Sequence, residues 1–239
     1  MILLVMEKLK FWLRSLVRKS VAIHSLTLLL RGRKTVYSLL RTDIVIEGFP
    51  RSGNTFFVRL VMALHQDLRV GSHFHSISSL KFCVDRKIPC VVLIREPIES
   101  LSSLIIKKRQ YLHRNDLATS VHSFIVDYIE FYEYAVRYKI PIMSFQIVTR
   151  NPKISIPIVQ SVISKQEFVV IDEATISSAA ISVKNELDLE RIGSLNANSS
   201  NRAKEDAKKL THNLIRGDAD FDRAQSLYDS IVNSFGFDD

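Results

Sequence analysis

A short turn with two glycines carries residue types that bind anions. Gly48 and Gly53 are separated by four residues, and Asn54 and Thr55 follow the second glycine. An apolar run precedes this turn and a helical spacing of apolar residues follows it, so the turn leads into the start of a helix. Free N–H groups in the first turn of a helix point towards a ligand, and the helix dipole favours negative charge there. With the charge of Arg51 beside it, this arrangement favours the binding of a phosphate or sulfate group.

The spacing of the two glycines is that of the ATP-binding P-loop, which has a lysine directly after the second glycine. Asn54 stands at that position here, and the fixed positive charge has moved back to Arg51. Thr55 keeps the hydroxyl of the P-loop. A loop without the lysine is poorly suited to ATP, but it can hold one compact phosphate with a second anionic group beside it. The glycine spacing alone is equally compatible with an ordinary strand–turn–helix connection.

Arg95 is the second residue whose position favours anion binding. It follows the apolar, strand-like run 89–94, and Pro97 suits the first turn of a helix after it. Side chains at the carboxyl ends of strands line the ligand-binding edge of open α/β sheets. Ser103 comes eight residues later. We therefore expect Arg95 at the ligand-binding edge and Ser103 on the helix that follows it.

Together these segments resemble the sulfotransferase family, whose members use 3′-phosphoadenosine 5′-phosphosulfate (PAPS). The turn at residues 49–55 is similar to the family's 5′-phosphosulfate loop, and Arg95 with Ser103 is similar to its 3′-phosphate motif. The two motifs have the expected order and a compatible separation. The resemblance covers residues 43–108 and is weak beyond them. It implies an α/β fold of the P-loop-like sulfotransferase type, PAPS as cofactor with adenosine 3′,5′-bisphosphate as product, and no metal.

The resemblance also implies which residues hold the cofactor: Arg51, Ser52, Gly53, Asn54, Thr55, Phe56, Arg95, Ser103 and Arg202. Phe56 stands where an aromatic ring can stack on adenine, although a place in the core is an equal alternative. The family has a late basic loop that closes over the 3′-phosphate. Arg202 is the candidate for that role here, but the matching glycine is absent.

A histidine between the two motifs is the implied catalytic base, because transfer to an acceptor requires removal of the acceptor's proton. His73 stands where the family usually has Lys-Thr-His, and His75 is its competitor. Arg51 occupies the position of a catalytic lysine in many members. Arginine keeps the charge but does not donate its proton readily, so Arg51 would act by electrostatics.

The elements that must position these residues alternate between strand-like and helical patterns. Strand-like runs occur at residues 44–46, 89–94 and 141–145, with a shorter candidate at residues 67–70, and the first two are expected to be buried. The longest helical pattern covers residues 120–139, and we expect its apolar face to lie in the core. Such alternation favours a three-layer fold, with helices on both sides of a parallel sheet. We expect residues 43–239 to form one α/β domain. Residues 1–42 would form a helical extension packed on it.

The 239-residue chain is long enough for one sizeable core, and its hydrophobic content of 46% is ordinary for a globular protein. The net charge of +8 suits a multiply anionic cofactor, and no nucleic-acid motif accompanies it. Cys83 and Cys90 match no zinc or redox pattern. Residues 1–20 are basic and amphipathic, so peripheral contact with a membrane is the alternative to packing on the domain. With no signal-peptide pattern, we expect a cytoplasmic protein.

The sequence therefore predicts a sulfotransferase that moves a sulfuryl group from PAPS to a hydroxyl acceptor, a small molecule or a glycan. A P-loop-like nucleotide kinase is one alternative. Asn54 argues against it, as does the lack of a clear acidic Mg²⁺ ligand at the end of a strand. A non-catalytic anion-binding protein of the same fold is the other alternative.

Overall fold

The computed structural model describes residues 42–72, 74–108, 117–163, 171–194 and 201–234, and the side chains of these residues outside 191–207. The predicted extension at residues 1–42 lies almost wholly outside these ranges. Helices alternate with strands along the described chain: β1 (Ile44–Gly48), α3 (Asn54–Leu64), β2 (Val70–Gly71), α4 (Ile77–Arg86), β3 (Cys90–Ile94), α5 (Pro97–Lys108), α6 (Leu117–Arg137), β4 (Ile142–Ser144), α7 (Phe145–Arg150), α8 (Pro152–Ile163), α9 (Glu173–Ser194), α10 (Asn201–Arg216) and α11 (Phe221–Ser234).

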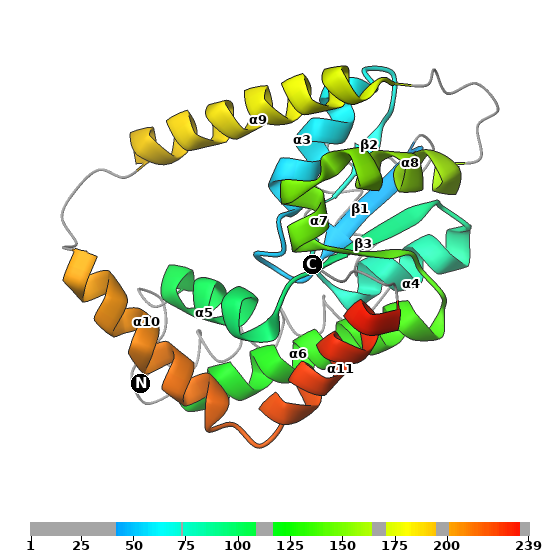
Figure 1. The fold of residues 1–239 in the computed structure, drawn as a ribbon. Coiled ribbons are helices and arrows are strands. Elements are labelled where there is room, and N and C mark those ends of the chain that lie inside the picture. Colours follow the sequence, from blue (N-terminus) through cyan, green and yellow to red (C-terminus); the bar gives the residue numbers. More distant parts are fainter. Residues whose placement is uncertain (1–41, 73, 109–116, 164–170, 195–200, 235–239) are drawn as a thin grey trace, which may run out of the picture.

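The described strands form one parallel sheet in the order β2-β1-β3-β4. After β1 the chain crosses through α3 to the edge strand β2, and then returns past β1 to β3 (Figure 1). The direction of winding therefore reverses between β1 and β3. At such a reversal the connections leaving the two strands diverge, and the carboxyl ends border a crevice that binds ligands in open α/β sheets.

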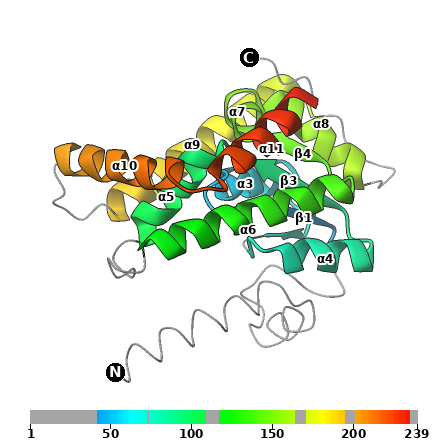
Figure 2. The same ribbon diagram turned by 90° about the horizontal axis from the view of Figure 1, so that it is seen from below.

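Helices cover both faces of the sheet, as the sequence predicted (Figures 1 and 2). Successive side chains of a strand point to opposite faces. Ile44 and Ile46 therefore enter a core with α3, α7, α8 and α9, whereas Val45 enters a core with α4, α5, α6 and α11. In β3, Val91 and Leu93 belong to the core with α3, whereas Val92 and Ile94 belong to the core with α6. Because β1 and β3 are buried on both faces, their sequences are apolar runs, apart from Glu47 near the end of β1.

Several boundaries differ from the sequence-based prediction. The predicted strand at residues 141–145 ends at Ser144, whose hydroxyl accepts a hydrogen bond from Ile147 N (3.2 Å) and caps a short helix, α7. The predicted short strand at residues 67–70 is also displaced, because only Val70 and Gly71 pair with β1. The cap at Ser144 matters for the site, because α7 begins there with Phe145, which lies close to Gly53 in the loop after β1.

Candidate active site

The loop after β1 is tightly confined between β3 and α7. A Cβ atom on Gly48 would lie 2.5 Å from the Leu93 carbonyl oxygen, so only glycine fits there. Gly53 has a φ of 88° and caps α3, and a Cβ atom on it would lie 2.7 Å from the ring of Phe145. Arg51 also adopts a left-handed conformation, with a φ of 76°. The two glycines of the sequence pattern are thus required by close packing and by backbone conformation.

The start of α3 carries no side-chain cap on Gly53 and no acidic residue in its first turn. The positive end of the helix dipole therefore keeps its ability to attract an anion from solvent. Thr55 is exposed at this end. Phe56 is half-buried and packs against the core that contains α3 and α8, which favours the core role over stacking on adenine.

The side chain of Asn54, at the position of the P-loop lysine, turns back into the loop. Its Nδ2 donates to the Gly48 carbonyl oxygen at 3.2 Å, and the residue is buried. At Asn54, therefore, the group available to bind an anion at the first turn of α3 is the main-chain N–H and not the side chain. The amide side chain instead stabilises the return of the loop onto the end of β1.

Arg51 and Arg95 connect the loop after β1 to the segment after β3. Arg51 Nε donates to Ser103 Oγ at 2.8 Å, and Arg95 Nη1 donates to the Arg51 carbonyl oxygen at 3.1 Å. The other branch of the Arg95 guanidinium contacts Glu99 at 3.2 Å. The guanidinium also lies 4.6 Å from the centre of the Phe145 ring, within the range of a cation–π interaction. Three residues that were predicted from two separate motifs thus lie together at one edge of the sheet.

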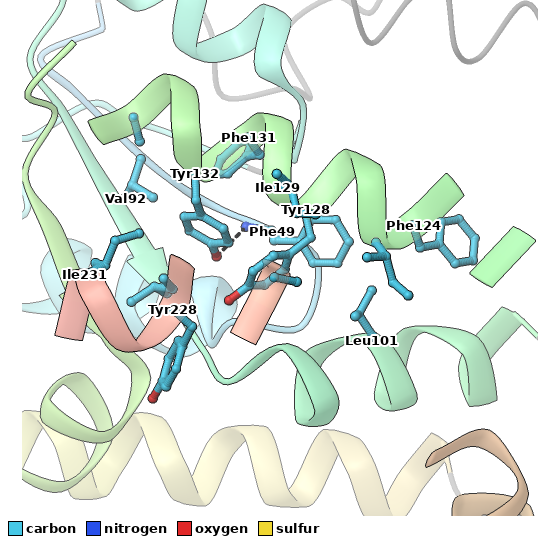
Figure 3. Close-up of a cluster of buried hydrophobic side chains, with 14 of the residues drawn as sticks. Phe49, Val92, Leu101, Phe124, Tyr128, Ile129, Phe131, Tyr132, Tyr228 and Ile231 are labelled. Atoms are coloured by element: carbon cyan, nitrogen blue, oxygen red, sulfur yellow. Dashed lines mark hydrogen bonds between the residues drawn. The ribbon is translucent and has the colours of Figure 1, made fainter. Parts of the chain in front are cut away.

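Two tyrosines on the buried face of α6 hold these two segments in place. Tyr132 Oη accepts a hydrogen bond from Phe49 N at 3.2 Å (Figure 3). It also donates to the Leu93 carbonyl oxygen at 2.8 Å and lies 3.3 Å from Ser52 Oγ. One turn earlier, Tyr128 Oη donates to the Arg95 carbonyl oxygen at 2.8 Å. Burial raises the pKa of Tyr132 well above its usual value, so its hydroxyl stays protonated and remains a donor.

Ser52 is the one hydroxyl of the predicted phosphate loop that is completely buried. Because the Tyr132 proton is used on a carbonyl oxygen, Ser52 Oγ is the donor in the contact between the two hydroxyls. The Ser52 side chain therefore anchors the loop to α6 in the core.

His75 is fixed from both its main chain and its ring. The carboxylate of Glu47, which is fully buried at the end of β1, accepts bonds from Phe74 N (2.9 Å) and His75 N (3.0 Å). His75 Nδ1 lies 2.8 Å from the Gly48 carbonyl oxygen and 3.5 Å from Glu47 Oε2. A donor, Asn54 Nδ2, lies 3.1 Å from the same ring nitrogen. Both the Gly48 oxygen and the Glu47 oxygen are acceptors, and together they favour the tautomer with the proton on Nδ1 and the lone pair on Nε2. This is the state that a general base requires.

A pocket opens beside His75, between the loop after β1 and α6. Its walls combine aromatic, aliphatic and acidic side chains, among them Phe49, Leu104, Phe124, Asp127 and Glu130. It lies next to the histidine on the α6 side of the sheet. Its volume of about 20 Å³ is enough for about one water molecule.

Two predicted site residues cannot be placed. His73 lies outside the described residues, and so does the side chain of Arg202 on α10. The structure therefore brings together Arg51, Arg95 and Ser103, and it places His75 in a hydrogen-bond network with Glu47 and Gly48.

Sequence reasoning missed four residues that shape this site: Glu47, Tyr128, Tyr132 and Phe145. Glu47 carried a signal, because it is a charged residue inside an otherwise apolar strand. The tyrosines had none beyond their place on the apolar face of α6, which the sequence correctly predicted as core. Phe145 was assigned to the end of a strand, where its contact with Gly53 could not be foreseen.

Among the described residues, one group of side chains could hold a metal ion: His122, Asp218 and Asp220, whose ligand atoms lie within 4.8 Å of one another. This group joins α6 to the turn before α11 and includes no residue of the loops after β1 and β3. Within the described part of the chain, every helix is too short or too polar to cross a membrane. Neither protein-family models nor curated proteins yield a match to this chain.

Proposed function

We propose that this protein transfers a sulfuryl group from PAPS to a hydroxyl acceptor. The observation that carries the proposal is the meeting of Arg51, Arg95 and Ser103 at the carboxyl edge of the sheet, through contacts of 2.8 and 3.1 Å. PAPS carries anionic groups at both its 5′ and 3′ positions. A site that combines a helix N-terminus with two arginines from separate loops can bind both groups at once.

The residues divide between the two ends of the cofactor. The loop after β1 and the first turn of α3 would hold the 5′-phosphosulfate, with Arg51 supplying the positive charge. Arg95 and Ser103 would hold the 3′-phosphate. Phe145 lies against both the Arg95 guanidinium and Gly53, so it contacts both of these segments. PAPS supplies the sulfuryl group on a phosphate leaving group, so negative charge increases near Arg51 as the group departs.

His75 is the base that the contacts support. Its Nε2 would take the proton of the acceptor hydroxyl, while Glu47 and the Gly48 carbonyl oxygen hold Nδ1–H and stabilise the positive charge that forms on the ring. His73, which the family resemblance implies, is the alternative. The pocket beside His75 would have to widen to admit an acceptor, because its volume of about 20 Å³ holds no more than a water molecule. Asp127 and Glu130 in its wall could then accept hydrogen bonds from the hydroxyl groups of a sugar.

The test is thermal stabilisation by adenosine 3′,5′-bisphosphate without metal, compared with ATP plus Mg²⁺. A ligand at about 100 times its dissociation constant stabilises the folded state by roughly 2.7 kcal/mol. We expect a clear rise in melting temperature with the bisphosphate and a much smaller one with ATP. A larger shift with ATP and Mg²⁺ would favour the kinase alternative. Binding of the bisphosphate without sulfuryl transfer to any hydroxyl acceptor would favour a non-catalytic anion-binding protein.

A further inference from the structure

Glu99 places a carboxylate inside the cluster of cations at the proposed 3′-phosphate site. Its Oε2 contacts Arg95 Nη2 at 3.2 Å, and its Oε1 lies 3.5 Å from Lys208 Nζ. The side chains of Arg95, Glu99 and Lys208 are 24%, 33% and 44% exposed. Each can therefore be reached by a ligand from solvent, and each can reorient without disturbing the buried core.

Two elements that are distant in sequence build this arrangement. Arg95, Glu99 and Ser103 are spaced four residues apart, so they lie in a row along one side of α5 and the residues before it. Lys208 comes from α10, which packs alongside α5 (Figures 1 and 2). Arg51 reaches the far end of the row at Ser103. A single described carboxylate, Glu99, thus bridges cations from two elements at the position assigned to the 3′-phosphate.

We propose that Glu99 is an internal competitor for the 3′-phosphate, and that Lys208 is a further cation of that site. The inference rests on the proposed function. Glu99 carries one negative charge and offers two oxygens, whereas a phosphate monoester carries close to two charges and three oxygens near neutral pH. A phosphate can therefore displace the carboxylate from Arg95 and Lys208, and a singly charged group gains little by doing so.

The consequence is selectivity for doubly charged groups. Without ligand, Glu99 holds Arg95 and Lys208 in place and partly neutralises them. When a singly charged sulfate ester or carboxylate displaces Glu99, the cations lose their attraction to Glu99. The attraction that they gain to the ligand is about as large, so the exchange has little net effect. A 3′-phosphate gains more than it displaces, since Arg95 can present two parallel N–H groups to it. The cost of displacing Glu99 lowers affinity overall, so removing its charge increases binding.

The experiment is calorimetric titration with adenosine 3′,5′-bisphosphate and with adenosine 5′-monophosphate, which lacks the 3′ group. Glu99→Gln removes the charge of the competitor and keeps its shape. We expect it to bind the bisphosphate several-fold more tightly than wild type does, because a like charge no longer faces the phosphate. Its affinity for the monophosphate should stay within about twofold of wild type.

Lys208→Ala tests the second half of the proposal. We expect its affinity for the bisphosphate to fall about tenfold, the low end for loss of a charge-assisted hydrogen bond, because the lysine is partly exposed. Lys208→Arg should keep most of the affinity. Lys209→Ala is the matched control, since it removes the same charge from the next, exposed position of α10. It should change binding by less than about twofold.

Two results separate the possible failures. If wild type does not bind the bisphosphate more tightly than the monophosphate, the proposed function fails and this inference fails with it. If wild type shows that preference but Lys208→Ala behaves like Lys209→Ala, or Glu99→Gln binds no more tightly than wild type, the inference alone is wrong. Thermal midpoints of all variants confirm that each is folded before it is titrated.

Discussion

At the scale of single residues, the role of a histidine depends on which of its ring nitrogens carries the proton. At His75 the Gly48 carbonyl oxygen and Glu47 both face Nδ1 and favour a proton there, although Asn54 Nδ2 lies 3.1 Å from the same atom. The His75 main-chain N–H also donates to the Glu47 carboxylate and holds this residue in place. These contacts support the proposed role of His75 as a base.

His75→Ala should reduce sulfuryl transfer by roughly 10²–10⁴-fold, because it removes the group that accepts the acceptor's proton. The affinity for adenosine 3′,5′-bisphosphate should change little, since a base acts on the acceptor. Turnover with PAPS and calorimetric titration of the bisphosphate measure the two effects separately. His73→Ala is the comparison. An inactive His73 variant beside an active His75 variant would assign the base to His73.

Arg95 is expected to act on both ends of the cofactor, but unequally. Arg95→Ala should weaken binding of adenosine 3′,5′-bisphosphate by roughly 10- to 100-fold, the loss of a hydrogen bond to a charged group. The affinity for adenosine 5′-monophosphate should fall much less, through loss of the contact with the Arg51 carbonyl oxygen. Titration of both ligands decides between the roles. Equal losses would show that Arg95 supports the loop alone and does not bind the 3′-phosphate.

At the scale of elements, α6 contacts both of the segments that we propose bind the cofactor. Tyr128 and Tyr132 are one helical turn apart, and their hydroxyls contact the segments after β3 and β1 respectively. Their rings belong to one aromatic cluster, in which the ring centres of Phe49 and Tyr128 lie 5.2 Å apart. The same helix face thus builds the core and aligns the site.

Tyr132→Phe should lower the free energy of unfolding by about 1–3 kcal/mol, because it leaves the buried Phe49 N–H and Leu93 carbonyl without their partner. Chemical denaturation measures this loss. Tyr138→Phe is a control, since that residue lies directly after α6 and is half-exposed. Equal stability of the Tyr132 variant and wild type would show that the hydroxyl does not hold the loop. We also expect the Tyr132 variant to bind the bisphosphate more weakly.

The start of α9 offers a test of helix capping by pH. Asp172 accepts bonds from the N–H and the hydroxyl of Thr175, at 2.8 and 2.7 Å. The bond from the Thr175 main chain is the main cause of a lowered pKa at Asp172. A lowered folded-state pKa means that the cap stabilises the fold at any pH above the usual aspartate pKa of about 3.9. That stabilisation is lost as the pH falls through the lowered value.

Asp172→Ala should therefore melt at a lower temperature than wild type at neutral pH, because the first turn of α9 loses its cap. The difference should shrink as the solution is acidified below the usual aspartate range. Thermal scans of both proteins at several pH values provide the measurement. A difference that does not depend on pH would show that the charge of Asp172 contributes nothing to the cap.

At the scale of the whole molecule, the excess of 33 lysines and arginines over 25 acidic residues produces a net charge of +8. Such a field attracts a multiply anionic ligand before it reaches the site, and salt screens the attraction. The association rate of adenosine 3′,5′-bisphosphate should therefore fall as ionic strength rises from about 0.01 to 0.15 M, where the Debye length shortens from about 30 to 8 Å. Stopped-flow mixing measures this rate. A rate that does not change would show that the net charge does not steer the ligand.

The local pattern of apolar and turn-forming residues was enough to predict those helices and strands whose formation depends mainly on their own residues. The apolar runs of β1 and β3 and the long apolar face of α6 were predicted as buried, and they are. The two glycines after β1 were predicted to belong to a turn at the start of a helix, which is correct. Each of these features follows from hydrophobic periodicity or backbone freedom within about a dozen residues.

Only the tertiary structure determined which of these residues meet. Arg51 contacts a serine 52 positions away, and Tyr132 contacts the loop after β1 across 83 positions. Glu47 could be recognised from the sequence as a charge within a strand, but its bonds to the main chain of Phe74 and His75 could not. Such contacts depend on the order in which strands pair and on which helix covers each face. Hydrogen bonds act over about 3 Å, so they are set by packing in space and not by separation along the chain.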